Sequence, residues 1–243
     1  MAEIQTKWVE LQVQDGTTMR AYVAGPQDGH LRAGLMVFQE AFGVNAHIRD
    51  VTERFACEGY LAVAPELFHR TAPGFEGAYD NFAAVMPHMR ALNDQGLEAD
   101  ARAAYSFLQE STNPHKTPLA SVGFCLGGRV SFLANSIVAI KAAVSFYGGG
   151  IAPNPQSPGM LSRASNLNAP QLLFWGGQDK HIGPEQRQAV TEAIIQAGKR
   201  YVNVEFSDAD HGFFCDARAS YNRAAAQQAW TLTHAFLNFY LHS

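Results

Sequence analysis

Hydrophobic and polar positions along this chain predict strands and helices in alternation. Residues 7–13 and 18–24 alternate apolar and polar side chains on either side of Asp15-Gly16, which is typical of an antiparallel β-hairpin. Continuous apolar runs follow, and such runs are typical of strands buried on both faces of a parallel sheet. These runs lie at residues 34–38, 60–65, 119–122, 142–147, 171–175 and 202–206.

Segments with helical character separate these runs. They span residues 46–58, 93–110, 184–197 and 220–241, while residues 68–92 predict a loop followed by a short helix. Residues 148–169 are rich in Gly, Pro, Asn and Ser, which predicts a long loop. Since strands alternate with helices, we expect an α/β fold, with a mostly parallel central sheet covered by helices on both faces. No linker or repeat is visible, so residues 1–243 are expected to form a single domain.

Composition narrows the possible partners. The 243 residues are 47% hydrophobic and 16% charged, with a net charge of −4, as in ordinary soluble globular proteins. No basic block indicates nucleic acid as a partner, and no apolar stretch approaches the roughly 20 residues of a membrane span. The N-terminus lacks the apolar run of a signal peptide. We therefore expect a cytoplasmic monomer or small homo-oligomer that acts on a small molecule.

The cysteines are the first chemically suggestive residues. Cys57, Cys125 and Cys215 are odd in number and lack CxxC spacing, which argues against a disulfide framework or a zinc ribbon. The histidines are scattered without the spacing of metal ligands. The sequence therefore predicts reduced thiols, with neither a metal nor a cofactor.

Cys125 lies where an apolar strand gives way to a helical segment, in Gly123-Phe124-Cys125-Leu126-Gly127-Gly128. A side chain at the tip of so sharp a turn needs neighbours without a Cβ atom, and Gly123 and Gly127 bracket Cys125 at that spacing. The helix that follows directs N–H groups and its positive dipole end at the turn, which favours a thiolate and an oxyanion. This pattern predicts a nucleophile elbow, although such turns and buried cysteines are also common for structural reasons.

Three further polar residues follow the ends of other predicted strands. They are Glu40, Asp179 and His211. The carboxyl ends of parallel strands meet at one edge of a sheet, so we expect these side chains near Cys125. The chain order of nucleophile, acid and histidine is that of the α/β-hydrolases.

These residue types suit acyl transfer. His211 would activate the Cys125 thiol, and Asp179 would hold the other imidazole nitrogen and stabilise the imidazolium. The backbone N–H groups of Leu126 and Ala41 are the expected oxyanion hole. A thioester would form on the cysteine and then be hydrolysed.

Each of these residues also has a purely structural interpretation. Asp179 could accept hydrogen bonds from its own turn. His211 could pair with its neighbour Asp210. Glu40 could cap the helix that starts near Ala46. The sequence alone leaves these alternatives open.

Five segments together resemble the dienelactone hydrolase family. They occur in the order found in the family. The five segments are Gln39-Glu40-Ala41-Phe42-Gly43-Val44-Asn45; the stretch from Gly59-Tyr60 through Pro65-Glu66-Leu67; the Cys125 hexapeptide; Gly176-Gly177-Gln178-Asp179; and His211-Gly212-Phe213. The resemblance covers the chain from about residue 8 to its end. The glutamate segment and the cysteine in the elbow separate this family from the serine-based α/β-hydrolases.

The resemblance implies a lidless α/β-hydrolase that opens a lactone or enol-ester ring, with Cys125, Asp179 and His211 as the triad. It also implies that Glu40 holds the resting thiol until substrate displaces it. Tyr147, Phe42, Phe213 and Cys215 are expected at the substrate pocket.

The departures from the family pattern concern the substrate. Type members hold the substrate carboxylate with two arginines, one of them four residues after the catalytic histidine. Here that position is Cys215, and residues 71–89 contain no arginine. Arg70, Arg90 and Arg218 lie nearby in the sequence.

We therefore expect a cysteine-dependent hydrolase of small activated esters or lactones. One alternative is an amidase or peptidase on the same triad, which would have to protonate a poorer leaving group. Another is a binding protein that keeps the pocket without turnover. A redox role for Cys125 would need a resolving cysteine, and none is evident in the sequence.

Overall fold

The computed structural model describes residues 3–113, 116–155 and 157–242. It divides into two units, residues 1–120 and 121–243, which are described in turn. The eight strands are mostly parallel and alternate with helices, which confirms the predicted α/β class. The expectation of one domain over the whole chain stays a prediction.

The first unit contains the predicted hairpin. Strands β1 (Ile4–Gln12) and β2 (Thr18–Pro26) pair antiparallel, and β2 also pairs antiparallel with β4 (Tyr60–Pro65). Strand β3 (Ala33–Phe38) is parallel to β4, so the order is β1-β2-β4-β3. Every residue of β3 is buried, as its continuous apolar run predicts.

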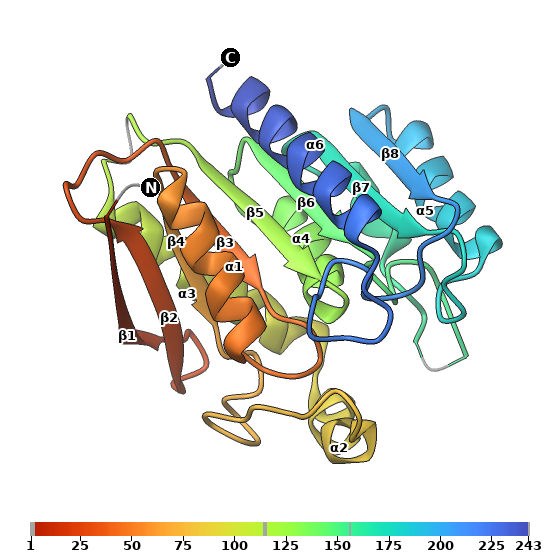
Figure 1. Ribbon diagram of the computed structural model, residues 1–243, viewed down its shortest axis with the longest axis horizontal. Helices are drawn as coiled ribbons and strands as arrows, with labels where there is room; N and C mark the ends of the chain where they lie inside the picture. The colour runs from red at the N-terminus through yellow and green to blue at the C-terminus, as the bar shows by residue number, and fades with distance from the viewer. Residues whose placement is uncertain (1–2, 114–115, 156, 243) are drawn as a thin grey trace. The chain divides into compact units, whose positions relative to one another are not determined.

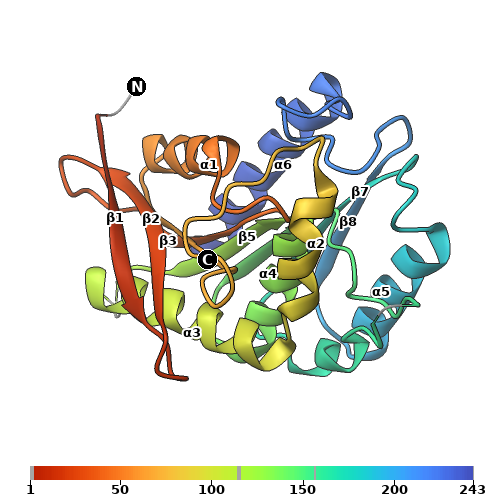
Figure 2. The ribbon, with the colours of Figure 1, turned by 90° about the horizontal axis from the view of Figure 1, so that it is seen from below.

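Helices α1 (Ala46–Cys57) and α3 (Asp94–Ser111) cover opposite faces of these strands (Figures 1 and 2). The short helix predicted after residue 68 is α2 (Phe82–Ala91). Asn45 begins α1, because its side-chain oxygen accepts the backbone N–H of Ile48 at 3.2 Å. Asn45 is therefore the residue that caps this helix, and Glu40 is not needed for that role.

Strand β5 (Leu119–Phe124) begins in the first unit and ends in the second, where the order is β5-β6-β7-β8. Strands β6 (Ala142–Phe146), β7 (Gln171–Gly176) and β8 (Tyr201–Phe206) are parallel to one another. Helices α4 (Leu126–Ile137) and α5 (Pro184–Gln196) lie on one face of this unit, and α6 (Arg223–Leu241) lies on the other (Figures 1 and 2). The predicted long loop contains a short 3₁₀ helix, η1 (Leu161–Asn166).

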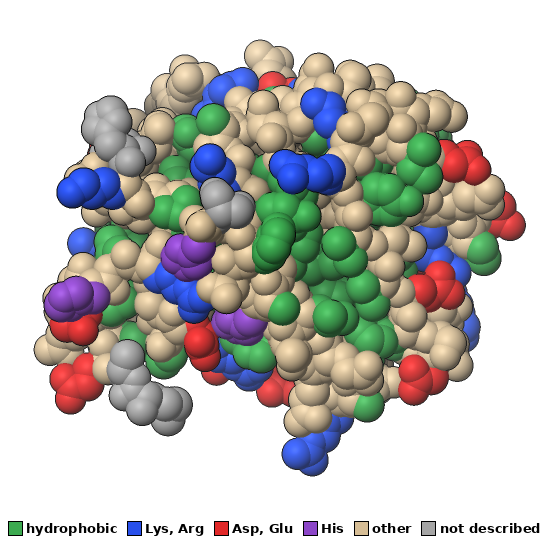
Figure 3. Space-filling model, turned by 90° about the horizontal axis from the view of Figure 1, so that it is seen from above, with side chains coloured by type: hydrophobic (Ala, Val, Ile, Leu, Met, Phe, Trp, Pro, Cys, Tyr) green, Lys and Arg blue, Asp and Glu red, His purple; other side chains and the backbone are tan. Residues whose placement is uncertain are grey.

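The surface carries both charges and some exposed apolar side chains. Hydrophobic side chains gather in one patch right of centre in the view of Figure 3, with acidic and basic side chains scattered around it. Exposed apolar residues of the second unit include Leu232 and Phe239 of α6. Among the described residues, no helix combines the length and hydropathy that a membrane crossing demands.

The close approach of β5 and α4 gives a first prediction. A Cβ atom added at Gly123 would lie 1.9 Å from the backbone oxygen of Gly127. Neither backbone segment can move away without a substantial cost in free energy. We expect Gly123→Ala to lower the free energy of unfolding by about 2 kcal/mol or more, within the range known for overpacked sites. Chemical denaturation measures the change.

Gly149→Ala is the matched control, since its added Cβ would approach only Ile182, at 3.8 Å. The steric argument fails if both substitutions have the same effect on stability.

Candidate active site

Cys125 occupies the turn between β5 and α4 in a left-handed backbone conformation, with φ 54° and ψ −116°. L residues with a side chain rarely adopt such dihedrals, and those that do are enriched at functional sites. Gly123 allows the strand to pass close to the first turn of α4. Cys125 is partly exposed, which is compatible with the approach of a small molecule.

Gly128 allows α4 to lie close to the end of β6. An added Cβ there would lie 2.7 Å from the Phe146 backbone oxygen and 2.8 Å from Ser145 Oγ. The backbone N–H of Cys125 also donates to the Phe146 carbonyl at 3.0 Å. These contacts hold the elbow against the sheet and present the N-terminus of α4 to the thiol.

Asp179 follows β7, and both of its carboxylate oxygens are engaged. Oδ1 accepts the backbone N–H groups of His181 (2.7 Å) and Ile182 (3.1 Å), and Oδ2 lies 2.7 Å from Nδ1 of His211. The local turn and the contact with His211 therefore coexist. Burial acts to raise the pKa of Asp179, but the hydrogen bond and charge of His211, together with the two N–H groups, lower it overall.

The glycines before Asp179 allow two turns to meet. A Cβ on Gly176 would lie 2.6 Å from the Ala209 carbonyl oxygen, and one on Gly177 would lie 2.7 Å from Ser207. The turn after β7 thus packs directly against the turn after β8. This contact brings Asp179 to His211, 32 positions later in the chain.

His211 joins the acid to the thiol. Its Nδ1 faces Asp179, and its side chain lies close enough to Cys125 for the cysteine to raise its pKa. Burial acts to lower the pKa of His211, but the negative charge of Cys125 and the hydrogen bonds to Asp179 and Cys125 outweigh it and raise the pKa to about 10. Asp210 accepts the backbone N–H of His211, at 2.6 Å, whereas the His211 ring contacts Asp179. The structure therefore brings the three predicted triad residues together.

Aromatic side chains surround His211. Tyr147 has a φ of 39°, and its ring centroid lies 5.1 Å from that of His211 and 5.2 Å from that of Phe213. Tyr147, Phe213 and Cys215 are all fully buried. Tyr147 and Phe213 thus belong to the surroundings of the histidine, and the pocket role of all three stays a prediction.

The other predicted site residues belong to the first unit, in the segment between β3 and α1. Glu40, Ala41 and Phe42 are buried there, and Ala41 and Phe42 pack with Val85 of α2. The gating role of Glu40, the oxyanion role of Ala41 and the pocket role of Phe42 stay predictions, as does the oxyanion role of Leu126, the first residue of α4.

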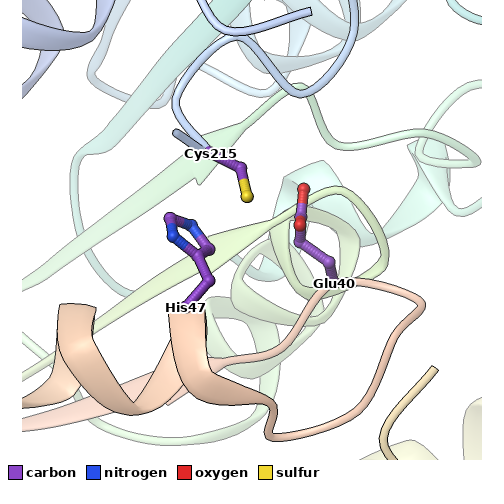
Figure 4. A group of neighbouring side chains, drawn as sticks. All are labelled: Glu40, His47 and Cys215. Carbon is purple, nitrogen blue, oxygen red and sulfur yellow. The ribbon is translucent and has the colours of Figure 1, made fainter. Parts of the chain in front are cut away.

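Figure 4 draws three buried side chains with atoms that can ligate a metal. Glu40 comes from the segment after β3 and His47 from the first turn of α1, with ligand atoms within 4.8 Å of each other. Cys215 comes from the loop between β8 and α6. Among residues 3–113, 116–155 and 157–242, neither unit taken alone contains a cluster of three such ligands. A zinc site requires at least three protein ligands.

The arginines near the family clamp positions differ in their surroundings. Arg70 is engaged in the first unit, where its guanidinium donates to Asp15 at 2.7 Å and to both oxygens of Asp100 at 2.8 and 3.0 Å. Arg90 lies on α2. Arg218 lies over Gly212, where an added Cβ would be 2.3 Å from its Nη1. Arg70 is thus committed to two carboxylates of the protein itself.

Sequence reasoning missed two residues around Asp179. Arg187 of α5 is buried and donates to the carbonyl oxygens of Gly176 (3.2 Å) and Ile182 (2.9 Å), which braces both ends of the Asp179 turn. His181 packs its ring against His211 at a centroid distance of 5.3 Å. Neither residue belongs to a recognisable motif, and only the tertiary structure reveals their contacts.

A nucleophile elbow, an acid after a later strand and a histidine after the last strand, on a mostly parallel sheet, define the α/β-hydrolase class. The chain belongs to the dienelactone hydrolase family, whose sequence pattern matches residues 19–241. It is therefore a hydrolase of carboxylic esters or lactones.

Individual relatives agree with this assignment. A Synechocystis protein named "Putative carboxymethylenebutenolidase" is 36% identical over 235 residues, which cover 94% of each chain. A protein of the same name from Escherichia coli (strain K12) is 37% identical over 227 residues, covering 88% of this chain and 80% of its own. A crystal structure described as a "Putative Dienelactone Hydrolase" from Klebsiella pneumoniae superposes with a TM-score of 0.85 at 32% identity, covering 97% of this chain and 99% of the other.

The contacts of His211 give a prediction about its protonation. Because its pKa is raised to about 10, we expect an imidazolium throughout the neutral range. The raised pKa stabilises the folded protein fully below about pH 6.5, and this stabilisation is lost as the pH rises through about 10. Cys125→Ala removes the cysteine that raises the pKa of His211 and should therefore lower that pKa. NMR titration of the ring nitrogens measures both values.

Cys57→Ala removes a thiol from the end of α1 and serves as the control, with no expected change at His211. A wild-type His211 that titrates at the ordinary value would contradict the assigned contacts.

Proposed function

We propose that this protein hydrolyses small activated esters or lactones through a thioester on Cys125. One observation carries the proposal: His211 contacts Asp179 and Cys125, and the thiol stands at a partly exposed strand-to-helix turn. An imidazolium beside a thiolate is the reactive state that cysteine hydrolases use, because the thiolate is the nucleophile.

In the first step, the Cys125 thiolate attacks the carbonyl carbon and forms the carbon–sulfur bond. The oxygen becomes an oxyanion, for which we propose the backbone N–H groups of Leu126 and Ala41 as donors. When the carbon–oxygen bond breaks, His211 gives its proton to the departing alcohol. The carboxylate of Asp179 keeps the imidazole oriented and stabilises its cationic form.

In the second step, neutral His211 takes a proton from water, and the resulting hydroxide equivalent attacks the thioester. The carbon–sulfur bond then breaks, and the acid product leaves. Cys125 returns as the thiolate beside the reprotonated His211. No oxidant, metal or cofactor is required for this cycle to balance.

Further features of the chain complete the proposal. Glu40 is buried after β3 and would hold the thiol at rest. We propose that residues 1–243 act as one domain, since the family match runs through both units. The cytosol keeps thiols reduced, which suits a catalytic cysteine and supports a cytoplasmic enzyme. Tyr147, Phe42, Phe213 and Cys215 would shape the pocket.

The direct test replaces the nucleophile. We expect Cys125→Ala to lower kcat for p-nitrophenyl acetate by at least about a thousandfold, as loss of a triad nucleophile does in other enzymes. Mass spectrometry of the quenched wild-type protein should show a mass increase of one acetyl group on the peptide that contains Cys125.

Cys57→Ser keeps a polar side chain in place of a thiol outside the proposed triad, and should retain wild-type activity. An amide with the same acyl group should react far more slowly than the ester, because an amine is the poorer leaving group. Full activity in the Cys125 variant would end the proposal, while equal rates on ester and amide would favour an amidase.

A further inference from the structure

His181 places a second imidazole directly against the histidine of the triad. The ring centroids of His181 and His211 are 5.3 Å apart, and the planes meet at 78°, an edge-to-face arrangement. The two residues differ in burial, because His211 is buried whereas His181 is exposed. His181 therefore presents an imidazole to solvent at the edge of the triad.

The turn around His181 is firmly held. Its backbone N–H donates to Oδ1 of Asp179 at 2.7 Å, and the next residue, Ile182, donates to the same oxygen at 3.1 Å. Arg187 donates to the Ile182 carbonyl at 2.9 Å. These bonds fix the backbone of His181 to the acid of the triad while its ring packs on the base.

We propose that His181 binds the leaving alcohol of the substrate, an inference that rests on the proposed function. His211 must bring its proton to the departing oxygen, so the alcohol portion leaves from a position next to the His211 ring. His181 packs on this ring and remains open to solvent, so we assign it to this position. The leaving group, rather than the acyl group, is thus the part of the substrate that His181 contacts.

The chemistry of imidazole indicates the class of alcohol. Its flat face packs on aromatic or conjugated groups, and its nitrogens can donate or accept a hydrogen bond. His181 therefore favours a phenol or an enol that carries a polar substituent. It makes no comparable contact with a small saturated alcohol.

The test uses three acetate esters with different leaving groups: 4-hydroxyphenyl, phenyl and trifluoroethyl acetate. All three give the same acetyl-enzyme, so they share one deacylation step. Rapid-mixing experiments separate the acylation rate from the deacylation rate. Wild type, His181→Ala, His181→Phe and Lys180→Ala are compared, the last as a neighbouring exposed residue.

We expect His181→Ala to slow acylation by both aryl esters about tenfold, a typical effect of losing one contact with a substrate group. Acylation by the trifluoroethyl ester should change less than about twofold. His181→Phe keeps an aromatic ring, so it should restore the acylation rate with the phenyl ester but not with the 4-hydroxyphenyl ester. Deacylation should be unchanged in every variant, and Lys180→Ala should behave as wild type.

Equal losses with all three esters, or slower deacylation, would instead show that His181 only supports His211 and would overturn the proposal. So would unchanged acylation in both His181 variants. Thermal unfolding of each variant verifies that it is folded. A wild-type enzyme that forms no acetyl-enzyme would refute the thioester mechanism itself, a result distinct from any comparison of the His181 variants.

Discussion

The left-handed backbone at Cys125 is the constraint around which the second unit is arranged. A residue with a side chain can hold this conformation only if its surroundings leave no alternative, and here the surroundings are backbone. Gly123 lies against the carbonyl of Gly127, and Gly128 lies against the end of β6. Strand, turn and helix therefore fit together only without Cβ atoms at these glycines, and the thiol is directed out of the turn.

Charge balance is the second constraint. Asp179 and His211 are buried, and an isolated charge at either position would be costly. The carboxylate is stabilised by two backbone N–H groups and the imidazolium, while the imidazolium in turn faces Cys125. The same arrangement that removes the cost of burial keeps a proton on His211, where the proposed mechanism uses it to protonate the departing alcohol. Stability and chemistry thus have a common physical origin.

In the first unit, the charged side chain of Arg70 binds two carboxylates of the protein itself. Arg70 follows β4, in the region where the family resemblance led us to look for a substrate-binding arginine, yet its guanidinium lies between Asp15 of the hairpin turn and Asp100 of α3. Its hydrogen bonds neutralise a fully buried aspartate. Leaving Asp100 without them would be costly. Arg70 is thus engaged by the protein itself, and the exposed His181 imidazole is the residue that we propose as a source of selectivity.

The sequence by itself determined the α/β class and the position of nearly every strand and helix, and it predicted the three residues that we propose as the triad. Apolar runs, helical periodicity and glycine spacing are local properties, and the family motifs mark the strand ends. Only the tertiary structure decided that Asp179 serves its own turn and His211 at once, and that Asn45 caps α1. It alone revealed Arg187 and His181, because their roles depend on contacts between segments that no local pattern encodes. At Cys125, the sequence predicted a nucleophile, whereas packing set the backbone conformation and the proximity to His211 on which the proposed role of the thiol depends.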